Sequence, residues 1–101
     1  MSGSGGYSGG RDVTTSCERL RFETVLSSPK PITAHINIGE RLTIELIDDD
    51  VYALYNGQLA GGISANEAAR LKHCLSGGHI FTGTVISAKL GSIKISINPG
   101  P

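Results

Sequence analysis

The sequence predicts a mainly β (α+β) fold, a small antiparallel six-stranded β-barrel with one capped α-helix at about residues 64–76. Short runs of alternating apolar and polar residues are separated by turns rich in glycine, asparagine and aspartate, which is typical of antiparallel strands. Only one stretch carries apolar residues at helical spacing. Six short strands beneath a single helix would leave exposed edges in a flat sheet, so we expect the sheet to close into a barrel.

The 101 residues suit one domain, which we expect over residues 17–98. Residues 1–16 contain five glycines and four serines, a composition typical of a flexible, disordered tail, and residues 99–101 are expected to form a short C-terminal tail. Nine basic and nine acidic residues cancel, so the chain lacks the broad positive field of a dedicated duplex-DNA or membrane-surface binder. It also has no apolar run of the roughly 20 residues that a membrane span needs.

The predicted strands follow from the alternation of apolar residues and from the turn residues between them. Two prolines within residues 29–31 end the first strand, because proline cannot donate a ladder hydrogen bond. Residues 32–38 alternate as a strand does, and the choice between a strand and irregular structure stays open there. Asn56–Gly57 predicts a type I′ hairpin turn, whose two central residues need positive φ. The six expected strands cover about residues 17–26, 41–47, 51–55, 58–61, 79–88 and 92–97.

The limits of the helix are predicted from local chemistry. Ser64 and Glu67 have the S-x-x-E spacing of a capping box, in which each side chain bonds the backbone N–H of the other residue. Gly77–Gly78 supplies a left-handed stop after residue 76.

A resemblance to a known family rests on residues 48–97. Between a predicted strand and a predicted hairpin lie three short motifs. They are the step Gly62-Ile63-Ser64, the helical stretch Glu67-Ala68-Ala69-Arg70-Leu71, and Leu75 followed by Gly77-Gly78. This arrangement resembles the second half of the HIRAN domain, a small β-barrel module found alone in bacteria and fused to helicase-like proteins in eukaryotes. The resemblance implies a β-barrel and the binding of single-stranded DNA ends.

No catalytic or metal-binding pattern is present, and we expect a non-enzymatic protein without metal or cofactor. Cys17 and Cys74 have no histidine or aspartate partner placed by a motif, and the chain has no G-x-S-x-G elbow. His73, Cys74 and His79 lack the paired, short spacing of structural zinc ligands. Two cysteines in a chain that opens without a secretory signal pattern are expected to be free thiols, which favours a cytoplasmic location.

The leading function is a binding module for single-stranded nucleic acid or its ends. Arg19 and Arg21 are expected on the outer face of the first strand, roughly 7 Å apart, a spacing that suits phosphates. Lys94 on the last strand and Arg41 would extend this strip. One of Tyr52 and Tyr55 is expected to face outward and could stack on a base, and Tyr52 is the residue we select. Outward polar alternation is also the default of any antiparallel sheet.

The alternative function belongs to a different class. A barrel with partly open edges and an isoleucine-rich final strand could accept a strand from a protein partner, or associate with itself. This alternative predicts a concentration-dependent mass and no nucleic-acid binding.

Overall fold

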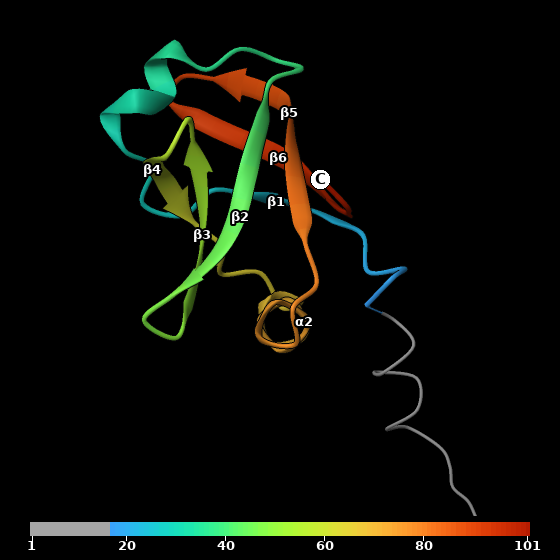
Figure 1. Ribbon diagram of the computed structural model, residues 1–101. Helices are drawn as coiled ribbons and strands as arrows, with labels where there is room; N and C mark the ends of the chain where they lie inside the picture. The colour runs from blue at the N-terminus through green and yellow to red at the C-terminus, as the bar shows by residue number, and fades with distance from the viewer. Residues whose placement is uncertain (1–16) are drawn as a thin grey trace, which may run out of the picture.

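The computed structural model describes residues 17–101, and the flexible tail expected over residues 1–16 lies outside the described residues. Figure 1 shows one curled antiparallel sheet of six strands with a single α-helix at one end. The predicted class, mainly β with six antiparallel strands and one helix, is confirmed. The elements are β1 (Phe22–Val25), the 3₁₀ helix η1 (Pro31–His35), β2 (Arg41–Ile47), β3 (Asp50–Tyr55), β4 (Gln58–Gly62), α2 (Ala68–Ser76), β5 (Phe81–Lys89) and β6 (Ser92–Pro99).

The sheet curls into a half-barrel whose two edges meet at one point. The strand order is β1-β6-β5-β2-β3-β4, so β1 and β4 are the edge strands. Ser27, just after β1, and Gly62, at the end of β4, form an isolated antiparallel bridge in which each N–H donates to the other's carbonyl, at 2.9 and 2.8 Å. We call this contact the seam. The expected closure into a barrel is therefore partial, because β1 and β4 form no ladder and only this bridge, with a neighbouring hydrogen bond, joins the two edges.

A glycine at the seam allows the two edges to approach. A Cβ atom on Gly61 would lie 3.0 Å from the Cβ of Leu26 and 3.1 Å from the carbonyl oxygen of Ser27. Next to it, the Lys30 N–H donates to the Ala60 carbonyl at 2.8 Å. A larger residue at position 61 would push the edges apart.

The core fills the inside of the curl. Along β2 and β6 every second side chain is buried, as the alternation predicted, and α2 adds Leu71 and Cys74 from the end that it covers beside β2 and β3. The largest fully buried side chains are Phe81, Leu42, Leu71, Ile93, Ile95, Ile97, Val85 and Cys74. No helix within residues 17–101 is long and apolar enough to cross a membrane.

The predicted start of the helix is wrong, whereas its predicted end is confirmed. The helix begins at Ala68 and no side chain caps it, so the Ser64–Glu67 capping box does not form. The Ile63 N–H donates to the Val51 carbonyl at 3.0 Å, which keeps the chain on the sheet until a turn at residues 65–67 frees it.

The helix ends after Ser76 in a Schellman motif. The His79 N–H donates to the Cys74 carbonyl at 3.1 Å, and the Gly78 N–H donates to the Leu75 carbonyl at 3.0 Å. Gly78 takes the left-handed conformation, with φ +95°, that this motif requires.

The expectation of two free thiols is wrong, because Cys17 and Cys74 form a disulfide with a Cα–Cα distance of 5.6 Å. The chain at residues 17–19 turns beside α2, and β1 therefore starts later than predicted, at Phe22. The two cysteines are 57 positions apart in the sequence, which explains why no local pattern predicts the bond.

Two further segments differ from simple strands and tails. The ambiguous stretch at residues 32–38 contains the 3₁₀ helix, which starts at Pro31, where the fixed φ of proline favours a helical turn. Residues 99–101 begin with the last residue of β6. The Gly100 N–H donates to the Ile80 carbonyl at 2.8 Å, and its own carbonyl accepts from the Thr82 hydroxyl at 2.7 Å.

Candidate functional site

Two of the four predicted contact residues, Arg21 and Lys94, contact side chains across β1 and β6, whereas both arginines precede β1 rather than lying on the first strand as predicted. Arg19 is exposed in the turn before β1, and Arg21 donates from Nη1 to Oδ1 of Asn98 at 3.0 Å. The Lys94 ammonium lies 3.5 Å from a carboxylate oxygen of Glu23 on β1. The arrangement of β1 and β6 thus sets a carboxylate beside Lys94, which offsets its charge, and an amide oxygen beside Arg21, which occupies one of its N–H donors.

The fourth residue, Tyr52, lies elsewhere. It belongs to β3, and two strands separate β3 from β6 in either direction around the curl. Arg41 is on β2, away from both positions. The structure therefore does not bring Tyr52 together with Arg19, Arg21 and Lys94.

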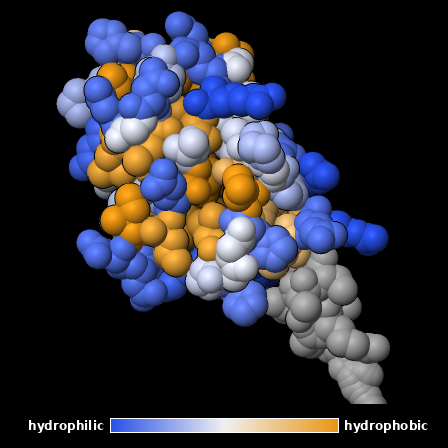
Figure 2. All heavy atoms as spheres, in the orientation of Figure 1, coloured by the Kyte–Doolittle hydropathy of each residue, from blue (hydrophilic) through white to orange (hydrophobic). Residues whose placement is uncertain are grey.

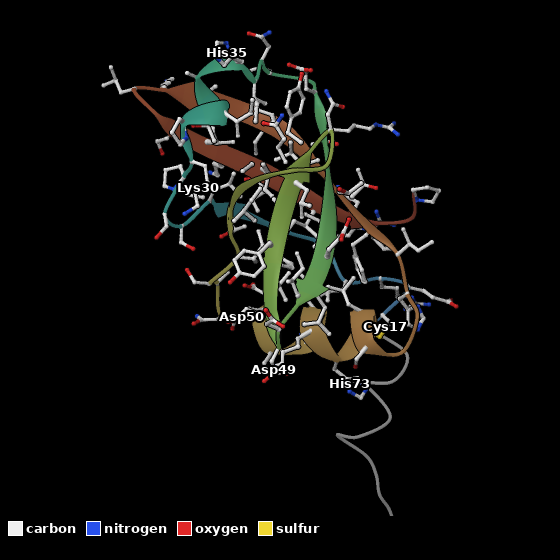
Figure 3. The ribbon with its side chains drawn as sticks, turned by 60° about the vertical axis from the view of Figure 1, so that its left-hand side comes forward. Cys17, Lys30, His35, Asp49, Asp50 and His73 are labelled. Atoms are coloured by element: carbon white, nitrogen blue, oxygen red, sulfur yellow. A yellow bond between two sulfur atoms is a disulfide. The ribbon has the colours of Figure 1, made fainter. Side chains whose placement is uncertain are left out.

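Tyr52 instead lines an open pocket of about 400 Å³ at the seam, which we call the seam pocket. Three segments contribute to it: residues 27–30, the β3–β4 hairpin, and residues 63–64 that lead toward α2. Figure 3 shows Lys30 and Asp50 on this side of the molecule. Its polar and aromatic lining consists of Ser27, Ser28, Lys30, Asp50, Tyr52 and Ser64.

The local backbone explains how these side chains meet. Ser28 has φ +48°, whereas a residue before proline normally has φ near −120°. Unfavourable φ values of this kind persist where the surrounding structure enforces them, and they are found at binding sites more often than elsewhere. The reversal at Ser28, followed by the Lys30–Ala60 hydrogen bond, brings residues 27–30 against the hairpin.

Sequence reasoning found Tyr52 but missed the other members of the pocket. The sequence predicts only a strand break from Ser27 to Pro31, although the two serines and the lysine there carry polar chemistry. It predicts a helix cap at Ser64, and because that cap does not form, the exposed Ser64 side chain lines the pocket. No sequence pattern placed residue 28 beside residue 52.

A second concavity, of about 430 Å³, lies between β2 and the chain entering β5, and we call it the β2–β5 groove. The two strands pair only at Arg41–Thr43 and then separate, while β2 continues to pair with β3 as far as Ile47. Ile44, Ile80 and Phe81 line the groove, and Ile80 is 61% exposed. Figure 2 shows hydrophobic surface among polar side chains on the face viewed there, which includes β2 and β3.

The shortest side-chain hydrogen bond among residues 17–101 lies outside both concavities. The Tyr55 hydroxyl donates to Oε1 of Glu40 at 2.5 Å, and the Asn37 N–H donates to Oε2 at 2.9 Å. The hydrogen bond from Tyr55 lowers the pKa of Glu40, with a further contribution from Asn37, and the same bond raises the pKa of Tyr55. This pair ties the loop before β2 to the end of β3.

Within residues 17–101, no three histidine, cysteine, aspartate or glutamate side chains are grouped so that they could hold a metal ion. No protein-family model, curated protein or solved structure matches this chain. The resemblance to the HIRAN domain therefore stays a prediction.

Proposed function

We propose that this domain is a non-enzymatic binding module whose seam pocket takes a nucleotide of single-stranded nucleic acid, or of its end. The observation that carries the proposal is that Tyr52 and Lys30 line the same open pocket. An aromatic ring stacks on the face of any base, and an ammonium group pairs with a phosphate. The resemblance to the HIRAN domain points to the same class of ligand.

The remaining side chains suit the other parts of a nucleotide. The Ser27, Ser28 and Ser64 hydroxyls both donate and accept hydrogen bonds, as sugar and base edges require. Asp50 can accept a hydrogen bond from an N–H of a base, such as N3–H of thymine, and repels a phosphate on its own side of the pocket. Arg19, Arg21 and Lys94 would contact only a strand long enough to pass around the sheet from the seam pocket.

The few charged side chains of the pocket predict that the binding affinity depends only weakly on salt concentration. One or two phosphate contacts to a single strand give a slope of log K against log salt of roughly −0.7 to −1.4. A dedicated duplex binder, with many phosphate contacts, would have a much steeper slope.

The test is the binding of a short fluorescent oligothymidine, followed by anisotropy. We expect Tyr52→Ala to weaken binding roughly 10- to 100-fold, because stacking of one base contributes about 1–3 kcal/mol. Tyr52→Phe keeps the ring and should bind as the parent does. Lys30→Ala should reduce the slope of log K against log salt by roughly 0.7. Lys89 is an exposed lysine outside the pocket, so Lys89→Ala should leave this slope unchanged.

Two results of this experiment would contradict the proposal: no binding by the parent protein at low salt, or equal binding by Tyr52→Ala. Oligothymidines with free and with blocked 3′ ends distinguish binding of a strand end from binding anywhere along a single strand. Chemical shifts near Tyr52 that respond only to a free end would indicate end binding, and shifts indifferent to the end would indicate general strand binding.

The second candidate is a protein partner in the β2–β5 groove, favoured by the exposure of Ile80 at an apolar concavity. Self-association through this groove would give a concentration-dependent mass in sedimentation that Ile80→Lys abolishes. A monomer at all concentrations that nevertheless binds oligothymidine would support the first candidate alone.

A further inference from the structure

A covalent bond joins the start of the described chain to helix α2. Cys17 and Cys74 are the only cysteines of the protein, and they are linked across 57 residues. Figure 3 shows Cys17 beside α2, at the end of the molecule opposite η1. Both residues are buried, with 5% and 1% of their surfaces exposed.

The burial identifies the bond as structural. Thiol–disulfide exchange needs a thiolate to reach one of the two sulfur atoms, and redox-active pairs are therefore accessible, often in a C-x-x-C motif. Here both residues are shielded by the core and the two come from distant segments. A bond of this kind resists reduction and does not cycle.

The bond also ties α2 to the turn that leads into β1, and neither element is well secured by its local contacts alone. β1 has four residues and stands at an edge of the strand order, where it pairs with β6 alone among the strands. α2 has nine residues and no side-chain cap, and helices shorter than roughly 12–15 residues are marginal by themselves. Closing a long loop removes much of the entropy of the unfolded chain, so the bond favours the docked arrangement of both elements.

We infer that the protein matures by oxidation of Cys17 and Cys74 and works in an oxidising compartment, outside the reducing cytosol. Structural disulfides persist in secreted, periplasmic and lumenal proteins, whereas cytosolic reductants keep thiols reduced. In the maturing step the two thiols lose two electrons and two protons to a disulfide-exchange catalyst. The catalyst's own disulfide is thereby reduced to two thiols.

This inference is independent of the ligand of the seam pocket, and it replaces the cytoplasmic location that free thiols favoured. If both proposals hold, the nucleic acid bound by the domain is a strand outside the cytosol.

The experiment measures the thiol state of the full chain in the cells that naturally produce it. Cells are quenched in acid, free thiols are alkylated with a maleimide–polyethylene glycol, and the chain is detected by immunoblot. We expect no mass shift without prior reduction, and a shift of two labels after reduction under denaturing conditions. Two labels without reduction would overturn the inference.

A second measurement tests the structural role. The double variant Cys17→Ala, Cys74→Ala lacks the disulfide and replaces each cysteine by a smaller non-polar residue. We expect a nonspecific protease to cleave this variant roughly 100- to 1,000-fold faster than the oxidised parent, because closure of a long loop is lost. The reduced parent, which keeps both sulfur atoms in the core, serves as the control for the lost volume and should show nearly the same acceleration. Equal cleavage rates for the reduced and oxidised parent would overturn the structural role.

Discussion

The seam and the β1–β6 face both carry residues that the sequence predicts to bind a ligand, yet the side chains around these residues differ between the two regions. On the β1–β6 face, cross-strand register sets Glu23 beside Lys94 and Asn98 beside Arg21. At the seam, residues 27–30 meet residues of the more distant stretch 50–64 around a concavity that is lined by Tyr52 and Lys30. Cross-strand neighbours therefore pair one cation of the β1–β6 face with a carboxylate and occupy a donor of another, whereas a concave site arises where the curl of the sheet brings its edges together.

The largest expected effect is on the seam itself. Gly61→Val adds a branched side chain where a Cβ would already lie 3.0 Å from Leu26. We expect a loss of about 1–3 kcal/mol in the free energy of unfolding, measured by chemical denaturation, together with weaker oligothymidine binding. Gln58→Val, which adds the same side chain at an exposed position of β4, is the control and should change neither quantity by a comparable amount. An unaffected Gly61→Val variant would mean that the seam is not closely packed.

The β3–β4 turn and the β5–β6 turn provide a second comparison, because only one of them has the residues that its backbone conformation favours. The β3–β4 turn next to the seam has Asn56–Gly57, with φ +50° and +83°, which the type I′ turn favours. The β5–β6 turn has the same conformation but places Leu90, φ +51° and fully exposed, where asparagine or glycine is preferred.

We therefore expect Leu90→Asn to stabilise the protein by about 0.5–1 kcal/mol in thermal or chemical denaturation, because a strained φ is relieved. Leu90→Ala keeps a Cβ at positive φ and should give no such gain. A neutral or destabilising Leu90→Asn would show that the Leu90 side chain contributes to the fold after all.

A smaller effect is expected on the β1–β6 face. Lys94→Gln removes an ion pair whose two side chains are about half exposed. Exposed pairs contribute little, so we expect a change of less than about 0.5 kcal/mol in unfolding and no change in oligothymidine binding. A loss of binding as large as that of Tyr52→Ala would move the primary contact from the seam to this face.

The last expectation concerns pH. The hydrogen bond from Tyr55 lowers the pKa of Glu40 below its ordinary value of 4.5, so the ionised carboxylate stabilises the fold above that pH. This contribution is lost as the pH falls through the lower, folded pKa. The pKa of Tyr55 is raised above 10.0 by the same bond, so the contribution of its protonated hydroxyl is lost as the pH rises through the folded value.

Denaturation curves measured at a series of pH values give the free energy of unfolding as a function of pH. In Tyr55→Phe we expect part of the loss of stability at acid and at alkaline pH to disappear. Thr43→Val, which removes a hydroxyl from β2 that does not contact Glu40, serves as the control. Unchanged pH profiles in Tyr55→Phe would show that the pair does not couple folding to protonation.

The sequence by itself determined the fold class and most of the strands, because side-chain alternation and turn chemistry act over a few residues. β2 was predicted with its observed bounds, as was the end of α2, where Gly77–Gly78 leaves no alternative to a left-handed stop. The start of α2 failed because a backbone hydrogen bond from Ile63 to Val51, invisible in the local pattern, holds the chain on the sheet.

Only the tertiary structure decided the features on which function rests. The disulfide joins residues 57 apart, and the seam pocket joins Lys30 to Tyr52 through the bridge between Ser27 and Gly62. Sequence periodicity records which face of a strand is buried, but it carries no information on which distant strand lies alongside. The curl and register of the sheet supply that information, since they set which outward side chains share a concavity and which neutralise one another.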